Sequence, residues 1–470
     1  MGFKLKSLAT KKILITKLVI CLLFEYSYAQ DSIKSPPSLP RIPKGQKSFR
    51  AYYTRLNYTA EWDQLWRVGK FADVLVTFDD SEIGFMFWRG ANYIPQWVSE
   101  NGIWYNNQFV ERRANADGLK GCIEPMSDKR CRYSHVRIIE NNKVRKIIHW
   151  RYAPVDLEYR RPFIDPKTGE GDWVDEYYII YPDASAVRSA TLYSTAINEF
   201  TDWQESIVVN QPGTRPEDNI DSTAISISNL EGKVAYYTWP ERADKGMNNL
   251  PAGSCIQIVN IKSKMKPYIV VPPDPDLKIF PFRKHSPISI FHWWDHWPVS
   301  MEKSSTHKAV DKSKPSHTSL TCWKGWEPYS TSNNSKTFVM LHGMTNKPAE
   351  QLINLAKSWL QPAKIEIVSK GYVYEGYDRQ EKAYCIKRAI ANPQNTLSFI
   401  IESSKAYPLH NPAFIIRKWG DKQVKVKVEG SVQRPEEIRQ AIEYGLDGNT
   451  LVLWFKVDLS EEVVFSISPI

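Results

Sequence analysis

The sequence predicts an all-β protein in which a large antiparallel β-sandwich, of the supersandwich kind, precedes a smaller C-terminal β-sandwich. Short runs of alternating or β-branched residues recur along most of the chain, and turn signals separate them. Convincing helical periodicity is confined to one stretch. Numerous strands with few helices between them favour packed antiparallel sheets. A β-propeller is the alternative, although no repeat of about 40 residues is visible.

Three pairs of strand-like runs in the first part of the chain predict hairpins. Each pair is joined by polar turn residues, which is the usual signal for antiparallel neighbours. The pairs are 71–80 with 82–90, 134–142 with 143–155, and 173–181 with 186–193. Further strand-like runs follow at 205–210, 224–229, 234–239 and 255–261.

One predicted helix marks the boundary between two regions that differ in the length and spacing of their strand-like runs. Residues 348–360 repeat apolar side chains at helical spacing, and a shorter helix is expected over 435–444. Seven short strand-like runs follow residue 362, which suits a small β-sandwich. The sequence therefore predicts a main β domain over 48–347, a connecting helix over 348–361 and a C-terminal domain over 362–470.

The N-terminus has the features of a cleavable signal peptide over residues 1–29. Five lysines precede the apolar run 18–24, and Ser27-Tyr28-Ala29 offers small residues for cleavage before Gln30. The apolar run is shorter than the roughly 20 residues that span a bilayer. We therefore expect a secreted, periplasmic or extracellular protein without stable membrane insertion. Residues 30–47 are proline-rich and predict an extended leader.

Net charge points to an anionic partner outside the cytoplasm. Cleavage would remove five lysines and Glu25, so the formal charge of +10 would fall to +6. A basic protein in that compartment suits an anionic sulfated polysaccharide better than a nucleic acid. Solubility alone would explain the charge equally well, and oligomeric state is left open. The 17 Trp and 24 Tyr residues suit stacking on sugar rings or burial in sandwich cores.

Cysteine count and spacing also suit an exported protein. Five cysteines would remain after cleavage, so at least one thiol must be unpaired within the chain. Cys122 and Cys131 lie nine residues apart in one loop, and we expect a disulfide between them.

Two histidine–arginine pairs are predicted to lie side by side. Strand alternation places His149 and Arg151 on one face of their strand, and the preceding strand similarly pairs His135 with Arg137. Because the two strands form a hairpin, the pairs can adjoin and line a groove. The alternative is an exposed sheet face with solvated charges.

The next hairpin adds phenols, carboxylates and another arginine. Asp175 and Tyr177 share one face of its first strand, Glu176 and Tyr178 share the other, and Arg188 follows on the return strand. These residue types can remove the C5 proton of a uronic acid, because arginine neutralises the carboxylate, a base takes the proton and tyrosine protonates the leaving oxygen. The predicted roles are His135 or His149 as base, Tyr178 as acid, and Arg151 or Arg188 as carboxylate partner.

An aromatic cluster at 291–300 admits two interpretations. His292, Asp295 and His296 would supply ligands for a metal ion, while the tryptophans between them favour a carbohydrate-stacking loop or a buried turn. His296 and His317 are therefore candidate substrate-binding residues. No cofactor is expected to be required, a structural divalent metal is allowed, and its ligands are unknown.

The segment 88–107 is a third candidate, suited to binding hydroxyls and ring faces. Its alternative is a tightly packed connection between strands. The expected substrate-binding residues are Arg89, Asn92, Tyr93, Trp97, Asn101 and Trp104. Paired carboxylates for glycoside hydrolysis are best sought in Glu205 and Glu217.

Several strings together give the chain a family resemblance. WRGANYIPQWVSENGIWYNN, EPMSDKRCRYSHVRIIENN, HWRYAPVD, GDWVDEYYIIYPD and QESIVVNQPGTRPEDNI, with the later HWWDHWPVS, PSHTSL and EGYDRQEKAY, cover most of the mature chain. The chain resembles ulvan lyases of polysaccharide lyase family forty from marine polysaccharide-degrading bacteria. The resemblance implies endo-acting β-elimination of a sulfated polymer of rhamnose and uronic acid, which leaves unsaturated uronyl ends.

The predicted function is therefore that of a secreted ulvan lyase. Two alternatives remain: a glycoside hydrolase of an algal polysaccharide that uses Glu205 and Glu217, and a non-catalytic glycan-binding protein that presents Trp97, Trp104 and Trp294.

Overall fold

Strands dominate the structure, and the predicted all-β sandwich class is confirmed. The computed structural model describes residues 38–470 except 46–47, 60–70, 108, 113–117, 121–122, 129, 157, 201–202, 239–246, 248, 283–288, 293–314 and 390–395. Within these ranges two large and three smaller sheets form, and none of them closes into a barrel. The propeller alternative would need four-stranded blades, whereas the large sheets have nine and ten strands.

The nine-stranded sheet has the order β1-β2-β3-β4-β5-β10-β17-β15, with β16 also paired to β17. Its strands are β1 (Arg50–Thr54), β2 (Asp73–Thr77), β3 (Gly84–Phe87), β4 (Pro95–Val98), β5 (Trp104–Asn107), β10 (Trp203–Asn210), β15 (Lys278–Pro281), β16 (Ser289–His292) and β17 (Ser316–Lys324).

The ten-stranded sheet has the order β12-β11-β13-β14-β19-β9-β8-β7-β6, with β18 paired to β19. Its strands are β6 (His135–Asn141), β7 (Lys146–Tyr152), β8 (Trp173–Ile180), β9 (Ser185–Tyr193), β11 (Ile220–Ser228), β12 (Val234–Thr238), β13 (Ile256–Ile261), β14 (Lys266–Val270), β18 (Ser330–Thr331) and β19 (Ser335–Thr345).

The three predicted hairpins are confirmed as antiparallel pairs: β2 with β3, β6 with β7, and β8 with β9. Short helices interrupt the strands: η2 (Arg89–Ala91), η3 (Pro125–Ser127), η4 (Ile197–Glu199) and α2 (Pro216–Asn219).

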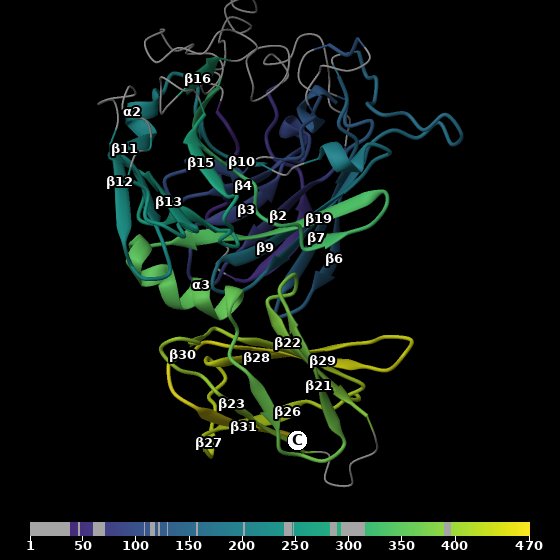
Figure 1. The fold of residues 1–470 in the computed structure, drawn as a ribbon, viewed down its shortest axis with the longest axis vertical. Coiled ribbons are helices and arrows are strands. Elements are labelled where there is room, and N and C mark those ends of the chain that lie inside the picture. The colour runs from purple at the N-terminus through teal and green to yellow at the C-terminus, as the bar shows by residue number, and fades with distance from the viewer. Residues whose placement is uncertain are drawn as a thin grey trace, which may run out of the picture. The chain divides into compact units, whose positions relative to one another are not determined.

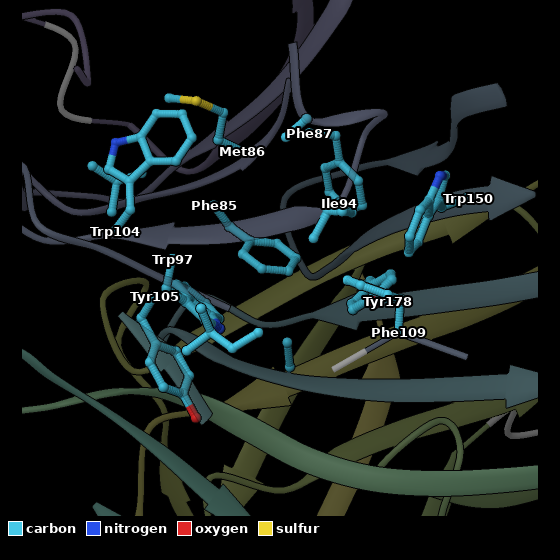
Figure 2. Packing of buried hydrophobic residues seen from close by; sticks show 14 of the residues in the cluster. Phe85, Met86, Phe87, Ile94, Trp97, Trp104, Tyr105, Phe109, Trp150 and Tyr178 are labelled. Carbon is cyan, nitrogen blue, oxygen red and sulfur yellow. The ribbon is translucent and has the colours of Figure 1, made fainter. Parts of the chain in front are cut away.

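Aromatic side chains fill the space between the two large sheets. Tyr178 of β8 lies 5.5 Å from Phe85 and 5.4 Å from Phe87 of β3, measured between ring centroids. Figure 2 shows these rings together with Trp97 and Trp150. Apolar burial on this scale is the main stabilising contribution of the fold, at roughly 25 cal/mol per Å². The face of each sheet that meets the other is called the inner face below.

The C-terminal sandwich contains two five-stranded sheets and a short two-stranded one, around a core of its own. All its pairs are antiparallel except β22 with β25. The strands are β20 (Ile365–Ile367), β21 (Tyr372–Asp378), β22 (Ala383–Arg388), β23 (Leu397–Ile401), β24 (Leu409–His410), β25 (Ala413–Arg417), β26 (Val424–Val428), β27 (Ser431–Val432), β28 (Ile438–Glu443), β29 (Thr450–Phe455), β30 (Asp458–Leu459) and β31 (Val463–Pro469).

The predicted helix is confirmed as η6 (Ala349–Leu352) followed by α3 (Ile353–Leu360). Its apolar side chains, with Trp359 1% exposed, pack on Val187, Ile258 and other residues of the ten-stranded sheet. Figure 1 shows α3 beside this sheet. The helix thus covers part of the sheet's outer face, which points away from the nine-stranded sheet.

The expected helix over 435–444 is wrong, because residues 438–443 form β28 and pair with β29. Ile438 and Ile442 pack against the C-terminal core, whereas Ala441 packs against a different cluster. Residues that alternate between two apolar environments favour a strand over a helix.

Residues 39–470 pack as one compact unit. A cluster at the junction of the two sandwiches joins Ile179 and Tyr181 to Cys385, Ile415 and Trp454. The domain boundaries predicted from the sequence stay predictions.

The end of the predicted leader packs on the nine-stranded sheet. Leu39 is 1% exposed, and its N–H donates to Gln211 Oε1 at 2.8 Å. The predicted signal peptide lies outside the described residues. In the described part of the chain, no helix is long and apolar enough to cross a membrane.

Three cysteines, Cys255, Cys322 and Cys385, are buried free thiols. Cys122 lies outside the described residues, so the Cys122–Cys131 disulfide stays a prediction.

Candidate functional site

A group of neighbouring polar side chains occupies the outer face of the ten-stranded sheet. Arg151 of β7 lies between His135 of β6 and Asp175 of β8, and His149 similarly lies between Arg137 and Tyr177. Cross-strand partners share a face, so the two rows adjoin as the sequence predicts. The outer-face cluster is defined as His135, Arg137, His149, Arg151, Asp175 and Tyr177.

His149 is held in one tautomer by its two neighbours. Arg137 Nε donates to His149 Nδ1 at 3.0 Å, and His149 Nε2 lies 2.6 Å from Asp175 Oδ1. A guanidinium can only donate, so Nδ1 must accept and the ring proton must lie on Nε2. The imidazole is 2% exposed. With both nitrogens engaged, His149 is arranged to position its neighbours rather than to take a proton from a ligand.

Tyr177 presents the phenol that faces solvent in this cluster. Its ring stacks on His149 with centroids 4.4 Å apart and planes inclined by 11°. The side chain is 38% exposed, and no described residue hydrogen-bonds its hydroxyl. The ring is therefore fixed by stacking while the hydroxyl is free to meet a ligand.

Arg151 is fixed at one end and exposed at the other. Its Nη1 donates to both carboxylate oxygens of Asp175, at 3.2 and 3.0 Å, and its guanidinium carbon lies 5.1 Å from the ring centroid of Trp173. Its side chain is 44% exposed. Such a geometry leaves guanidinium N–H groups available to a carboxylate.

Trp173 extends the cluster into a flat aromatic and cationic surface. The guanidinium carbon of Arg161 lies 5.6 Å from the ring centroid of Trp173. Arg161 Nη1 forms an ion pair with Glu170 Oε2 at 2.5 Å. Trp173 Nε1 also donates to Glu170, at 3.0 Å. Tyr193 lies opposite Trp173 and is 42% exposed. Burial raises the pKa of Tyr193, and Asp175 and Tyr177 add to the shift.

Positive charge predominates on this surface. Four guanidinium groups face two carboxylates, the cations being Arg132, Arg137, Arg151 and Arg161 and the anions Asp175 and Glu170. An excess of fixed cations beside exposed rings attracts a polyanion.

Tyr178 and Arg188 meet each other on the inner face instead. The hydroxyls of Tyr178 and Tyr152 donate to Glu176, and Arg188 donates to the same carboxylate through Nε and Nη2, both at 2.8 Å. Tyr178 is 4% exposed and Arg188 2%. Burial raises the pKa of Tyr178 well above its usual value, and Glu176 adds to the shift. Tyr178 and Arg188 are thus brought together, but the sheet separates them from the outer-face cluster.

Trp97 and His342 continue this internal network. Trp97 Nε1 donates to His342 Nδ1 at 2.8 Å. Burial, with a smaller effect from Arg188, lowers the pKa of His342 to about 3. His342 is therefore neutral at physiological pH and serves as a buried acceptor.

Most of the segment 88–107 is packed rather than presented to solvent. Arg89 pairs with buried Asp73 and donates to Leu56 O at 3.1 Å. Asn92 and Tyr93 adopt positive φ angles of 54° and 65°, and Asn92 Nδ2 donates to the carbonyl of Asp128. The segment therefore matches the packed-connection alternative at these positions.

The tryptophans of the same segment are also internal. Trp97 is 1% exposed and Trp104 0%, and Trp104 Nε1 donates to Pro40 O at 3.0 Å. Asn101 is exposed and donates to Lys262 O at 2.8 Å. Neither tryptophan offers a ring face to a sugar in this fold, and Trp294 lies outside the described residues.

Of the remaining histidine candidates, His317 lies in the core, and the side chains of His292 and His296 lie outside the described residues. His317 is 2% exposed, and burial lowers its pKa to about 3. His296 and Asp295 lie outside the described residues, as does the side chain of His292. The described residues include no group of three or more His, Cys, Asp or Glu side chains arranged to hold a metal ion. The metal hypothesis for His292, Asp295 and His296 stays a prediction.

Glu205 and Glu217 lie near opposite ends of β10. Glu205 is 4% exposed near the start of β10, and burial raises its pKa to about 8. Glu217 is in α2, which adjoins the far end of β10 through a hydrogen bond from Asn219 to Asn210. Five residues of strand span about 16 Å, whereas paired glycosidase carboxylates lie within about 10 Å.

The predicted site residues did not include Arg161, Trp173 and Tyr193, and the sequence placed Arg137, Asp175 and Tyr177 on this face without assigning them a role. The position of Trp173 on the face of Asp175 and Tyr177 was a usable signal, because strand alternation places all three together. Arg161 comes from a loop, and no spacing in the sequence connects it to Trp173.

Comparisons with known proteins assign no family. No protein-family model matches the sequence, and no curated protein matches it. Among the solved structures that match is the heparinase III-BT4657 gene product, aligned over 83% of this chain and 46% of its own, with 8% identity and a TM-score of 0.24. The chain thus spans less than half of that protein's length. An alignment at this TM-score does not establish a common fold or activity.

Proposed function

We propose that the protein is a polysaccharide lyase that cleaves an anionic, uronic-acid-containing polysaccharide at the outer-face cluster. One observation carries the proposal: an imidazole, a guanidinium and a phenol, from His135, Arg151 and Tyr177, are partly exposed neighbours on one sheet face. These three groups are the minimum set for elimination next to a carboxylate.

In the proposed reaction Arg151 binds the uronate carboxylate and stabilises the negative charge that develops when the C5 proton leaves. His135 accepts that proton. The electron pair of the C–H bond forms the C4–C5 double bond, the C4–O bond breaks, and Tyr177 gives its proton to the leaving oxygen. All bonds and electrons are then accounted for in both products, and the new chain end is an unsaturated uronyl residue.

His149 acts in this proposal as a positioning residue. Its two hydrogen bonds fix Arg137 and Asp175, and Asp175 in turn holds Arg151. The stack on Tyr177 fixes the direction of the phenol. This role replaces the predicted role of His149 as base, and Tyr177 replaces Tyr178 as acid.

The proposed substrate is ulvan, and the proposed location is outside the cytoplasm. The sequence resemblance to ulvan lyases supports the substrate, as does the excess of guanidinium groups around Trp173. The N-terminal sequence features support export.

Absorbance during incubation with polysaccharide tests the proposal. Purified residues 30–470 should raise the ultraviolet absorbance of ulvan, because only elimination makes the conjugated double bond, and alginate, pectin and chondroitin sulfate serve as comparisons. His135→Ala and Tyr177→Phe should each lower kcat by about 10²–10⁴ with an unchanged melting temperature. Tyr236→Phe is a matched control, since Tyr236 is 59% exposed on β12, away from the cluster. Full activity in both cluster variants would contradict the assigned roles.

A second candidate function is glycan binding without cleavage. Trp173 between the guanidinium groups of Arg151 and Arg161 favours it, because such a surface binds a polyanion without proton transfer. Retardation of the protein in an ulvan-containing gel, with no absorbance change and no smaller fragments, would support this function over elimination.

A further inference from the structure

A cavity of about 470 Å³ lies beside the outer-face cluster. Its lining comes from five parts of the chain: Asp274 after β14, Tyr329 before β18, Val339 of β19, Leu360 at the end of α3, and Arg379 in the turn between β21 and β22. A volume of this size suits a small ligand such as one or two sugar rings.

The sheet connects this cavity to the cluster. Val339 lies opposite Ser189 of β9, and Ser189 lies opposite Tyr177 of β8. Neighbouring strands are about 4.8 Å apart, so Val339 is roughly 10 Å from Tyr177, a span of about two linked sugar rings.

Small hydroxyl side chains lie between the two places, of which Ser189 is 6% exposed and Thr337 7%. The hydroxyls of Thr191 and Thr337 form a hydrogen bond at 2.8 Å in the next row. Tyr329 is tied to the same row, because its N–H donates to Thr337 O at 2.8 Å. A polysaccharide that extends from Tyr177 across β9 would therefore pass over small side chains and then reach Tyr329.

Tyr329 and Arg379 are fixed and accessible. Tyr329 is 40% exposed, and its hydroxyl lies 3.4 Å from Asp378 Oδ1. The guanidinium of Arg379 lies 5.9 Å from the Tyr329 ring centroid, and no described carboxylate forms an ion pair with it. The carbonyl of Arg379 accepts a hydrogen bond from Trp359 Nε1 at 2.9 Å, which anchors the turn to α3.

The charge of the cavity differs from that of the cluster. Two carboxylates, Asp274 and Glu327, line it with the single guanidinium of Arg379. A sulfated or carboxylated sugar would meet a negative excess here, whereas sugar hydroxyls can donate to the carboxylates and accept from the guanidinium.

We propose that Tyr329 and Arg379 form a second sugar-binding subsite that takes a ring without sulfate or carboxylate, such as an unsulfated rhamnose of the polymer, roughly 10 Å from the residue bound at Tyr177. The sugar stacks on the face of Tyr329, and its hydroxyls pair with Arg379 and Glu327. The proposal rests on the proposed function, because it assumes a polysaccharide on the outer-face cluster. It makes the C-terminal sandwich part of the binding surface through Arg379.

Binding of matched fragments tests the subsite independently of cleavage. Long ulvan fragments and the same fragments after chemical desulfation are titrated into the wild-type chain, Tyr329→Ala, Arg379→Ala and Glu327→Gln. Desulfation also weakens binding at the cationic outer-face cluster, and fragments too short to reach Tyr329 measure that loss alone. After this loss is subtracted, the wild type should bind long desulfated fragments more tightly than long sulfated ones. Tyr329→Ala and Arg379→Ala should each weaken binding of long desulfated fragments about tenfold. Glu327→Gln should strengthen binding of long sulfated fragments, since one repelling carboxylate is removed.

Tyr444→Ala is the matched control, because Tyr444 is 79% exposed and lies outside the cavity lining. Equal loss of affinity for short and long fragments in Tyr329→Ala would overturn the subsite, as would no loss at all. In either case the absorbance assay still reports on the proposed function. If the wild type bound neither kind of fragment, both proposals would be overturned.

Discussion

His149 links a buried position to the exposed part of the outer-face cluster. Its ring is almost fully buried, yet it contacts three members of the outer-face cluster: Arg137, Asp175 and Tyr177. The guanidinium on one nitrogen and the carboxylate on the other leave one protonation pattern that satisfies both. Buried polar groups with complete hydrogen bonding are rigid, so the cluster is preorganised before a ligand binds.

Glu205 gives a prediction at the residue scale. Burial raises its pKa to about 8, with an opposing hydrogen bond from Ser319 and a further rise from Glu111. The unfolded chain releases this proton near the ordinary glutamate pKa of about 4.3. Between that pH and about 8 the unfolded state therefore binds fewer protons than the folded state, and the free energy of unfolding falls as pH rises.

Glu205→Gln should remove this dependence, because the amide is neutral at every pH. The expected gain is on the order of 5 kcal/mol at pH above 8 and close to zero near pH 4. Denaturant titrations of wild type and variant at several pH values measure it. A difference that stays constant with pH would show that Glu205 ionises normally in the fold.

Single residues also show how far the sequence predicts the site. Alternation along β6 and β7 correctly predicts that His135 and Arg151 share a face and adjoin. Alternation does not tell which face a second sheet will cover, so Trp97 and Trp104 resemble ligand-binding rings until their burial is known. Arg161 reaches Trp173 from a loop, and such contacts between distant segments leave no local pattern.

At the scale of elements, α3 both covers apolar surface and fixes the turn that carries Arg379. Trp359 packs on the outer face of the ten-stranded sheet and donates to Arg379 O. The helix was predictable because its apolar spacing is regular. Strand β28 was not, because Ile438, Ala441 and Ile442 also fit a helical repeat.

Trp359→Ala should lower the free energy of unfolding by about 3–5 kcal/mol, because it leaves a cavity under the helix. It should also weaken binding at the proposed Tyr329 subsite, since the turn loses its anchor. Lys357→Ala on the same helix should stay within about 0.5 kcal/mol of wild type. Urea unfolding of the three chains measures the effect, and equal stabilities would contradict the packing role.

At the scale of the whole molecule, Arg145 joins the two sandwiches. Its guanidinium pairs with Glu140 of β6 at 2.9 Å, with Glu443 of β28 at 3.2 Å, and with Glu381. Burial alone would lower the pKa of Arg145, but Glu381 and the other carboxylates hold it well above its usual value. The hydroxyl of Tyr181 donates to the carbonyl of Glu381 beside this group.

Arg145→Ala should lower the free energy of unfolding by about 3–5 kcal/mol, because three crowded carboxylates lose their shared cation. We expect the wild type to unfold in a single calorimetric transition and Arg145→Ala to unfold in two, as the C-terminal sandwich loses its coupling to the main one. Arg434→Ala is the control, since Arg434 is 67% exposed and pairs only with Glu436 and Glu437 among the described residues. A single, unshifted transition in Arg145→Ala would show that the apolar junction alone couples the sandwiches.

Strand β8 belongs to the core and to the surface at alternate residues. Val174, Glu176 and Tyr178 point inward, while Trp173, Asp175 and Tyr177 point outward. Substitutions of the outward-pointing residues therefore leave the packing of the inward-pointing residues unchanged. On the proposed function, changes at every second position of β8 would alter the polymer that the outer face binds and leave the interior as it is.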